Sequence, residues 1–293
     1  MFPRAPDLHK PNKPLVPNGL GIFYVLISVV YLFLLYSLNI VKVSYGVSPV
    51  SPPLTLAVCV LFGGFMGLLD DWIDLKWRFK AFLPLVAAMP LAAFAYNIHI
   101  RTYMAIPLLG TINFGVWYYL VIVPVLVTIV TNTVNMLGGL NGLETVCPAI
   151  IMMGFMAMSA SNGVLLYGPL AAWLILAALN FEGKIFVGNT GSFTIGMTLA
   201  SFGIISDLKL DMIVSVLPYI FNSALILLTF FIYRAKAAVS FDGKKLSSDH
   251  RRSLITLLTF HRSLTERQVV LLISLIVAIS TSAALVLRLL FSK

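Results

Sequence analysis

The sequence predicts an all-α polytopic integral membrane protein, and three observations carry that prediction. Of its 293 residues, 59% are hydrophobic and only 11% are charged, whereas soluble domains carry about 25% charged residues. The mean hydropathy is +0.97. The apolar residues form long continuous runs and do not alternate with polar residues, which favours spanning helices and argues against a β-barrel.

Nine apolar runs are long enough, or nearly so, to cross a bilayer as helices. They are 20–41, 54–69, 81–98, 114–131, 145–160, 164–180, 192–206, 212–233 and 269–287. We interpret 1–293 as a single transmembrane domain of about nine helices. Residues 1–19 are expected to form an extended polar lead-in and 234–268 a large cytoplasmic loop.

The distribution of basic residues orients these spans. With the N-terminus in the cytoplasm, all but five of the 20 Lys and Arg lie on the cytoplasmic side, the exceptions being Lys42, Arg101, Lys209, Arg288 and Lys293. Cytoplasmic loops of membrane proteins carry an excess of Lys and Arg. We therefore expect a cytoplasmic N-terminus and an external C-terminus. The net charge of +9 reflects this bias and also suits an anionic substrate at the membrane surface.

Four polar segments fall on the predicted cytoplasmic face. The first, GLLDDWIDLKWRFK (67–80), places Asp70 and Asp71 directly after an apolar run. Adjacent carboxylates at a helix C-terminus oppose the macrodipole and repel each other, so their presence indicates a divalent cation or general-base site. The alternative is a solvated helix end with ion pairs to Lys76 and Arg78.

The second segment, TNTVNMLGGLNGLE (131–144), sets Asn132 and Asn135 on one helix face and then ends the helix with three glycines. Asn141 and Glu144 follow. Side-chain amides suit nucleobase edges, hydroxyls or metal ions without adding charge. Loop capping is the alternative.

The third segment, KIFVGNTGSF (184–193), has glycines on both sides of Asn189 and Thr190, directly before an apolar run. Backbone N–H groups in such a sequence can approach an anion at a helix N-terminus, and Lys184 adds positive charge. The segment matches neither GxxxxGK[ST] nor GxGxxG, so it does not indicate a nucleotide-binding fold. A plain turn or hinge is the alternative.

The fourth segment is the loop 234–268, in which DGKK (242–245) predicts a hairpin turn. Its basic residues and histidines are Arg234, Lys236, Lys244, Lys245, His250, Arg251, Arg252, His261, Arg262 and Arg267. They can contact lipid headgroups or clamp a diphosphate. The four segments together indicate an enzyme that acts on a phosphorylated substrate at the membrane surface. A transporter would place more of its polar groups within the spans.

In order along the chain, these segments resemble the motifs of the polyprenyl-phosphate N-acetylhexosamine-1-phosphate transferases. The matching stretches are PDLHKPNKPLVPNGLGIFY, LLDDWIDLKWRFK, NTVNMLGGLNGLE, KIFVGNTGSFTIGM and LITLLTFHRSLTERQVVLL, which together reach over most of the chain. The sequence GGLNG at 138–142 and the lack of a His-rich signature make the chain more similar to the eukaryotic and archaeal dolichyl-phosphate branch. The family usually has ten spans, so nine suggest that its first helix is missing.

The resemblance implies a reaction that depends on Mg²⁺, with Mn²⁺ as the alternative metal. UDP-GlcNAc would donate GlcNAc-1-phosphate to dolichyl or another polyprenyl phosphate and release UMP, the first step of lipid-linked oligosaccharide synthesis for protein N-glycosylation. The site would face the cytoplasm from an archaeal plasma membrane or an ER membrane. Membrane lipid is a further expected partner and nucleic acid is not; a homodimer is left open.

Matched motif to motif, the resemblance implies roles for individual residues. Asp70 and Asp71 fall on the catalytic pair, and Asn135 and Asn189 on metal-binding positions. Lys80 falls on a phosphate-contacting lysine, and Asn141 and Phe186 lie near the uracil. The other implied substrate-binding residues are Glu144, Asn132, Arg234, Lys236, His250 and Arg251, where His250 with Arg251 substitutes for a histidine that the family places between Arg234 and Lys236.

The family carries Asp at the position of Asn189. Asn keeps nearly the same shape but removes the charge, and a neutral amide is a poorer Mg²⁺ ligand than a carboxylate. We therefore interpret the chain as an inactivated Asp-to-Asn variant, either engineered to trap substrate or naturally of low activity. Two other functions stay open: another UDP-HexNAc-1-phosphate transferase of the family, and a non-catalytic protein that binds or transports lipid phosphates or nucleotide sugars.

Overall fold

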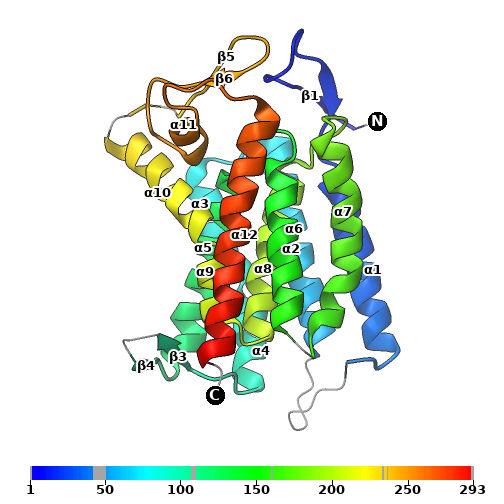
Figure 1. Cartoon of the computed structure of the whole chain (residues 1–293). Coiled ribbons are helices and arrows are strands. Elements are labelled where there is room, and N and C mark those ends of the chain that lie inside the picture. Colours follow the sequence, from blue (N-terminus) through cyan, green and yellow to red (C-terminus); the bar gives the residue numbers. More distant parts are fainter. Residues whose placement is uncertain are drawn as a thin grey trace.

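The computed structural model describes residues 2–41, 51–106, 110–159, 161–232, 234–235 and 237–291. Within them the protein is a bundle of helices with three short β-hairpins (Figure 1). The helices are α1 (Gly21–Ser37), α2 (Pro52–Ile73), α3 (Trp77–Ala87), α4 (Met89–Asn97), α5 (Val123–Met136), α6 (Leu143–Met158), α7 (Tyr167–Phe181), α8 (Gly188–Ile205), α9 (Lys209–Ser215), α10 (Leu217–Ile232), α11 (Leu254–Leu258) and α12 (Glu266–Phe291). A π-helical turn (Tyr118–Ile122) precedes α5 and a 3₁₀ turn (Gly163–Leu166) precedes α7.

Several of these helices are long and apolar enough to cross a membrane. Within the described residues five satisfy both criteria: Pro52–Ile73, Trp77–Asn97, Tyr118–Met136, Gly163–Phe181 and Glu266–Phe291. The pair α9 and α10 forms a sixth if its 56° bend lies within one span, and α1 and α6 are shorter apolar helices. Each of the nine predicted runs overlaps a helix or a helix pair, and five or six of them meet the length and hydropathy of a span.

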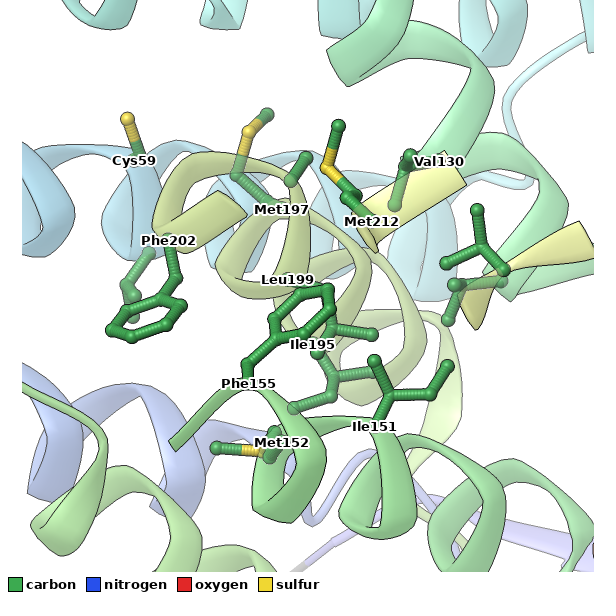
Figure 2. Close-up of a cluster of buried hydrophobic side chains, with 14 of the residues drawn as sticks. Cys59, Val130, Ile151, Met152, Phe155, Ile195, Met197, Leu199, Phe202 and Met212 are labelled. Atoms are coloured by element: carbon green, nitrogen blue, oxygen red, sulfur yellow. The ribbon is translucent and has the colours of Figure 1, made fainter. Parts of the chain in front are cut away.

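Helix α8 lies at the centre of the bundle and is buried from Thr190 to Ile205. It packs against α1, α2, α5, α6 and α9. Its many Gly, Ser and Thr residues let neighbouring helices approach closely, and the hydroxyls of Thr194 and Thr198 donate back to the carbonyl four residues earlier. Figure 2 shows Ile195 and Leu199 surrounded by side chains from other helices, and the Phe155 and Phe202 rings stack with centroids 6.1 Å apart.

The three hairpins correct the prediction that the chain is entirely α-helical. Strands β1 (Arg4–Pro6) and β2 (Leu15–Pro17) pair antiparallel, so the first residues fold back as a hairpin and are not an extended lead-in. Strands β3 (Tyr103–Ile106) and β4 (Gly110–Asn113) form the second hairpin at the opposite end of the bundle (Figure 1). The chain's two ends also lie toward opposite ends of the bundle.

The third hairpin confirms the turn predicted at DGKK. Strands β5 (Ser240–Phe241) and β6 (Leu246–Ser247) pair with Phe241 opposite Leu246. The N–H groups of Lys245 and Lys244 donate to the Asp242 carboxylate over 2.7 and 2.9 Å, which lowers the pKa of Asp242. This hairpin lies at the same end of the bundle as β1 and the start of α12 (Figure 1).

Candidate active site

Two cavities of about 230 Å³ each lie where the predicted polar segments meet. The first is lined by Asn18, Asp71, Asn135, Glu144, Phe186, Gly188, Asn189 and Ser192. The second is lined by Pro6, Asp7, Leu8, His9, Gly139, Leu140, Asn141, Glu144, Asn180 and Phe186. Because Glu144 and Phe186 line both, the cavities adjoin. The N-terminal hairpin and the first three polar segments all contribute to them.

Asp71 ties the end of α2 to the start of α8. Its Oδ1 accepts the N–H of Asn189 at 2.8 Å, and its Oδ2 accepts the N–H and the hydroxyl of Thr190 at 2.9 and 2.7 Å. The first N–H groups of a helix lack partners within the helix and carry partial positive charge, so a carboxylate there is stabilised. The anion that the sequence led us to expect at this N-terminus is therefore a side chain of the protein itself.

Gly188 allows this close approach between α2 and α8. Its φ is +69°, in the left-handed region that residues with a side chain adopt at a cost. A Cβ atom at Gly188 would lie 2.8 Å from Asp71 Oδ2 and 2.9 Å from the Cα of Gly19. A larger residue would therefore both strain the backbone and push the Asp71 carboxylate away from α8.

Replacing Gly188 by Ala is expected to lower stability by about 2 kcal/mol or more, because backbone strain and the clash with Asp71 add. Gly139→Ala is the matched control: Gly139 has φ +90° but nothing within 4 Å of its Cβ position, so backbone strain alone is expected to cost about 1 kcal/mol. Thermal unfolding in detergent compares the two. Equal shifts for both variants would show that contact with Asp71 does not constrain Gly188.

Asp70 faces a different partner from its neighbour. It is buried, and its Oδ1 accepts from Lys80 Nζ at 2.8 Å and from the N–H of Leu75 at 3.0 Å. Lys80 also reaches Asp74 at 3.4 Å. The alternative of ion pairs with Lys76 and Arg78 is thus wrong, since the cation that pairs with these carboxylates is Lys80. The Oδ2 of Asp70 is buried and has no hydrogen-bond partner among the described residues.

Oxygen donors surround the first cavity. The Ser192 hydroxyl donates to Asn135 Oδ1 at 2.5 Å, which joins the last turn of α5 to the first turn of α8. Glu144, in the first turn of α6, accepts the N–H of Gly139 at 3.1 Å. Amide, hydroxyl and carboxylate oxygens are the ligands that Mg²⁺ prefers, and the described lining includes no sulfur or imidazole. The donor set therefore fits a hard divalent cation.

The second cavity combines an aromatic wall with buried amides. Phe186 lines it from the segment before α8, and Asn141 lines it from the loop between α5 and α6. Asn180, buried in the last turn of α7, accepts the N–H of Gly142 at 2.9 Å and donates to the carbonyl of Ile185 at 2.8 Å. These bonds link the loop that carries Asn141 to the segment that carries Phe186.

Other predicted substrate-binding residues do not reach the cavities. Asn132 donates to the carbonyl of Thr128 within its own helix. Arg234 is exposed beyond α10, and Arg251 lies 4.1 Å from the Phe260 ring centroid. His250 lies against Ser248. Among the described residues, none of these four side chains lines either cavity, and Lys236 lies outside the described residues.

The structure also adds residues that the sequence analysis missed. Asn18 and Ser192 line the first cavity, and Asp7 and Asn180 line the second. Ser192 stands three residues after Asn189, so helical periodicity offered a signal for it. Asn180 is a lone amide at the end of an apolar run, which is also a usable signal. Asp7 and Asn18 carried none, because their positions depend on the unexpected N-terminal hairpin.

Comparison with known proteins gives this site a family. Residues 53–207, more than half of the chain, match the model of glycosyl transferase family 4. The chain belongs to this family. The match extends from α2 to the end of α8 and so includes Asp71, Asn135 and Asn189. As a member of glycosyl transferase family 4, the protein is a phosphotransferase and an integral membrane protein of a family whose members are in general metal-dependent.

Three relatives illustrate the range of the family. A protein of Saccharolobus solfataricus, provisionally named UDP-N-acetylglucosamine–dolichyl-phosphate N-acetylglucosaminephosphotransferase, is 31% identical over 96% of this chain and 87% of its own length. The Saccharomyces cerevisiae enzyme of that name is 28% identical over 74% of this chain and 58% of its own length. A phospho-N-acetylmuramoyl-pentapeptide-transferase of Clostridioides difficile is 28% identical over 67% of this chain and 64% of its own length.

Proposed function

We propose that this protein transfers GlcNAc-1-phosphate from UDP-GlcNAc to dolichyl or another polyprenyl phosphate, forming GlcNAc-diphospho-lipid and UMP. This would be the first step of lipid-linked oligosaccharide synthesis for protein N-glycosylation. The observation that carries the proposal is the convergence of Asp71, Asn135 and Asn189 on one cavity, beside a second cavity lined by Asn141 and Phe186. The names of the Saccharolobus and Saccharomyces relatives support the choice of substrates.

The proposed reaction brings an anionic acceptor phosphate to an anionic diphosphate, so neutralising charge is its main requirement. We assign the metal to the first cavity, where Asn135 and Asn189 would hold Mg²⁺, or Mn²⁺, with Ser192 and Glu144 nearby. The metal supplies positive charge to the diphosphate oxygens when bound. We also assign Lys80 as a further cation for phosphate. It lies in the first turn of α3, where it pairs with Asp70, and it does not line either cavity.

The two aspartates are assigned to the acceptor side of the reaction. Asp71 holds the loop that carries Asn189, through three hydrogen bonds to the start of α8. To Asp70, whose buried Oδ2 has no partner among the described residues, we assign the role of accepting a proton or orienting the acceptor phosphate. We place the uracil in the second cavity, against the Phe186 ring and close to Asn141.

We further propose about nine spans with a cytoplasmic N-terminus, in an archaeal plasma membrane or an ER membrane. The two chain ends lie toward opposite ends of the bundle, as an odd number of crossings requires (Figure 1). Both cavities lie at the end that receives the N-terminal hairpin and the basic loop. The excess of Lys and Arg on that side supports a site facing the cytoplasm.

The test is an assay with radiolabelled UDP-GlcNAc and dolichyl phosphate, on this chain and on its Asn189→Asp variant. The expected products with Mg²⁺ are a labelled lipid and UMP, and EDTA should stop their formation. Release of UDP, or no lipid product from Asn189→Asp, would contradict the proposal. Protection of the protein against thermal unfolding by UDP-GlcNAc, without UMP release under any metal, would instead indicate a binding or transport protein.

A second transferase reaction is kept as an alternative because the Clostridioides relative is named for a different sugar substrate. Competition separates the two. Unlabelled UDP-GlcNAc should reduce the formation of labelled lipid from radiolabelled UDP-GlcNAc more effectively than UDP-GalNAc or UDP-MurNAc-pentapeptide does, if the proposed substrate is correct.

A further inference from the structure

Asn141 is held by two carboxylates that come from opposite ends of the chain. Its backbone N–H donates to Glu266 Oε1 at 2.7 Å. Its side-chain nitrogen donates to the same Glu266 oxygen at 3.0 Å and to Asp7 Oδ2 at 2.8 Å. All three N–H groups of Asn141 therefore end on carboxylates. Asn141 is 5% exposed and Asp7 2% exposed, so the bond between them is buried, and the two bonds to Glu266 are partly buried.

The two carboxylates fix which way the Asn141 amide points. A carboxylate only accepts hydrogen bonds, so the nitrogen end of the amide must face Asp7 and Glu266. The arrangement also argues against a second cation at this place. Ligand atoms of Asp7, His9 and Glu266 lie within 4.8 Å of one another, but the Asn141 nitrogen donates to both carboxylates and Lys10 Nζ lies 3.5 Å from Asp7 Oδ2, so both carboxylates have partners without a metal.

Each carboxylate is itself held by a structured element. Asp7 follows β1, its N–H donates to the carbonyl of Pro14 at 3.0 Å, and its Oδ1 accepts the N–H of His9 at 3.2 Å. Glu266 is the first residue of α12, where Thr265 and Gln268 cap the helix reciprocally. The loop that carries Asn141 has no regular structure of its own. Asn180 and Glu144 hold the backbone of this loop at Gly142 and Gly139, whereas Asp7 and Glu266 hold Asn141 itself.

We propose that Asp7 and Glu266 are positioning residues of the nucleotide pocket, which act by holding Asn141 at the wall of the second cavity. This inference rests on the proposed function, because it takes that cavity as the place of the nucleotide. Removing one carboxylate leaves a buried N–H without a partner, and the loop then moves to satisfy it. Nucleotide binding weakens as a result, while Asn135 on α5 and Asn189 and Ser192 on α8, which the loop does not carry, keep their places around the first cavity.

Glu266 offers the sharper test, because both of its bonds to Asn141 end on one oxygen. A glutamine keeps an acceptor oxygen at that place, whereas alanine removes it. Glu266→Ala should weaken UMP binding about 10- to 100-fold, the range found when hydrogen bonds to a charged group or to an orienting residue are lost. Glu266→Gln should remain within about threefold of the parent. Asp7→Ala should behave like Glu266→Ala.

The probe is UMP, whose binding to the full-length protein in detergent is measured by calorimetric titration. KM and kcat for UDP-GlcNAc are then measured with each substitution made in the Asn189→Asp background. The expected effect is a higher KM with kcat changed by less than about threefold. Glu182→Gln is the matched control: this exposed carboxylate lies at the end of α7 and pairs with Lys184, not with Asn141. It should leave UMP affinity unchanged.

Unchanged UMP affinity in Glu266→Ala would overturn the inference. Equal losses in Glu266→Ala and Glu266→Gln, or a fall in kcat without a rise in KM, would overturn it as well. These outcomes leave the proposed function intact as long as the parent binds UMP and the Asn189→Asp protein turns over UDP-GlcNAc. A parent chain that does not bind UMP overturns both.

Discussion

Asn189→Asp is expected to raise turnover by about 100- to 1,000-fold, the range that a single electrostatic group supplies in other enzymes. The Asn189 side chain lines the first cavity, where the described carboxylates are Asp71 and Glu144. Both oxygens of Asp71 already accept from α8, and Glu144 Oε1 accepts from Gly139. An aspartate at position 189 would therefore add a carboxylate that is not already bonded, facing the proposed metal. The substitution leaves its backbone N–H bond to Asp71 in place.

UMP release at saturating Mg²⁺ measures the gain, and Mn²⁺ affinity by electron paramagnetic resonance gives a second reading. Asn132→Asp is the control. It adds the same charge on α5, about one helical turn before Asn135, but Asn132 lines neither cavity. It should produce no increase. If Asn189→Asp also produces none, position 189 has no metal role and the description of this chain as an inactivated variant is wrong.

Asp71→Asn, made in the Asn189→Asp background, is expected to lower turnover by about 1,000-fold or more. The Asp71 carboxylate accepts three hydrogen bonds from the start of α8. An asparagine has one acceptor oxygen, so its NH₂ group would face an N–H donor at one of these places. The turn that presents residue 189 to the cavity then loses its anchor. Lipid-linked product formation measures the loss.

Thr190→Val gives a graded comparison, because it removes the hydroxyl bond to Asp71 and keeps the carboxylate. A loss of about tenfold is expected from one hydrogen bond to a charged group. Gel filtration and thermal unfolding should show that both variants remain folded. Full activity in Asp71→Asn would show that neither the charge nor the bonds of Asp71 are needed, which contradicts the role given to the pair.

The helices and the meeting of the polar segments could be predicted because both depend on local properties of the chain. Continuous apolar runs mark helices whatever their neighbours are, and charge bias places the loops between them on one face. The contacts of Asn135 and Asn189 around one cavity follow from that topology. The glycine-flanked turn before α8 was also a local signal, and Gly188 does adopt a positive φ.

Tertiary partners could not be predicted in the same way. Asp70 pairs with Lys80 and not with the nearer Lys76 or Arg78, because Asp74 has φ +45° and turns the chain between α2 and α3. The N-terminal hairpin was missed since its proline-rich strands are three residues long and carry little pattern. Without the hairpin, nothing in the sequence connects Asp7 to Asn141.

Asn141 leaves the ribosome 125 residues before Glu266, to which its backbone N–H bonds. During synthesis the loop before α6 is therefore made, and its flanking helices inserted, while one of its two carboxylate anchors does not yet exist. Glu266 arrives only with α12, the last helix of the chain. We expect chains arrested before α12 to bind UMP weakly.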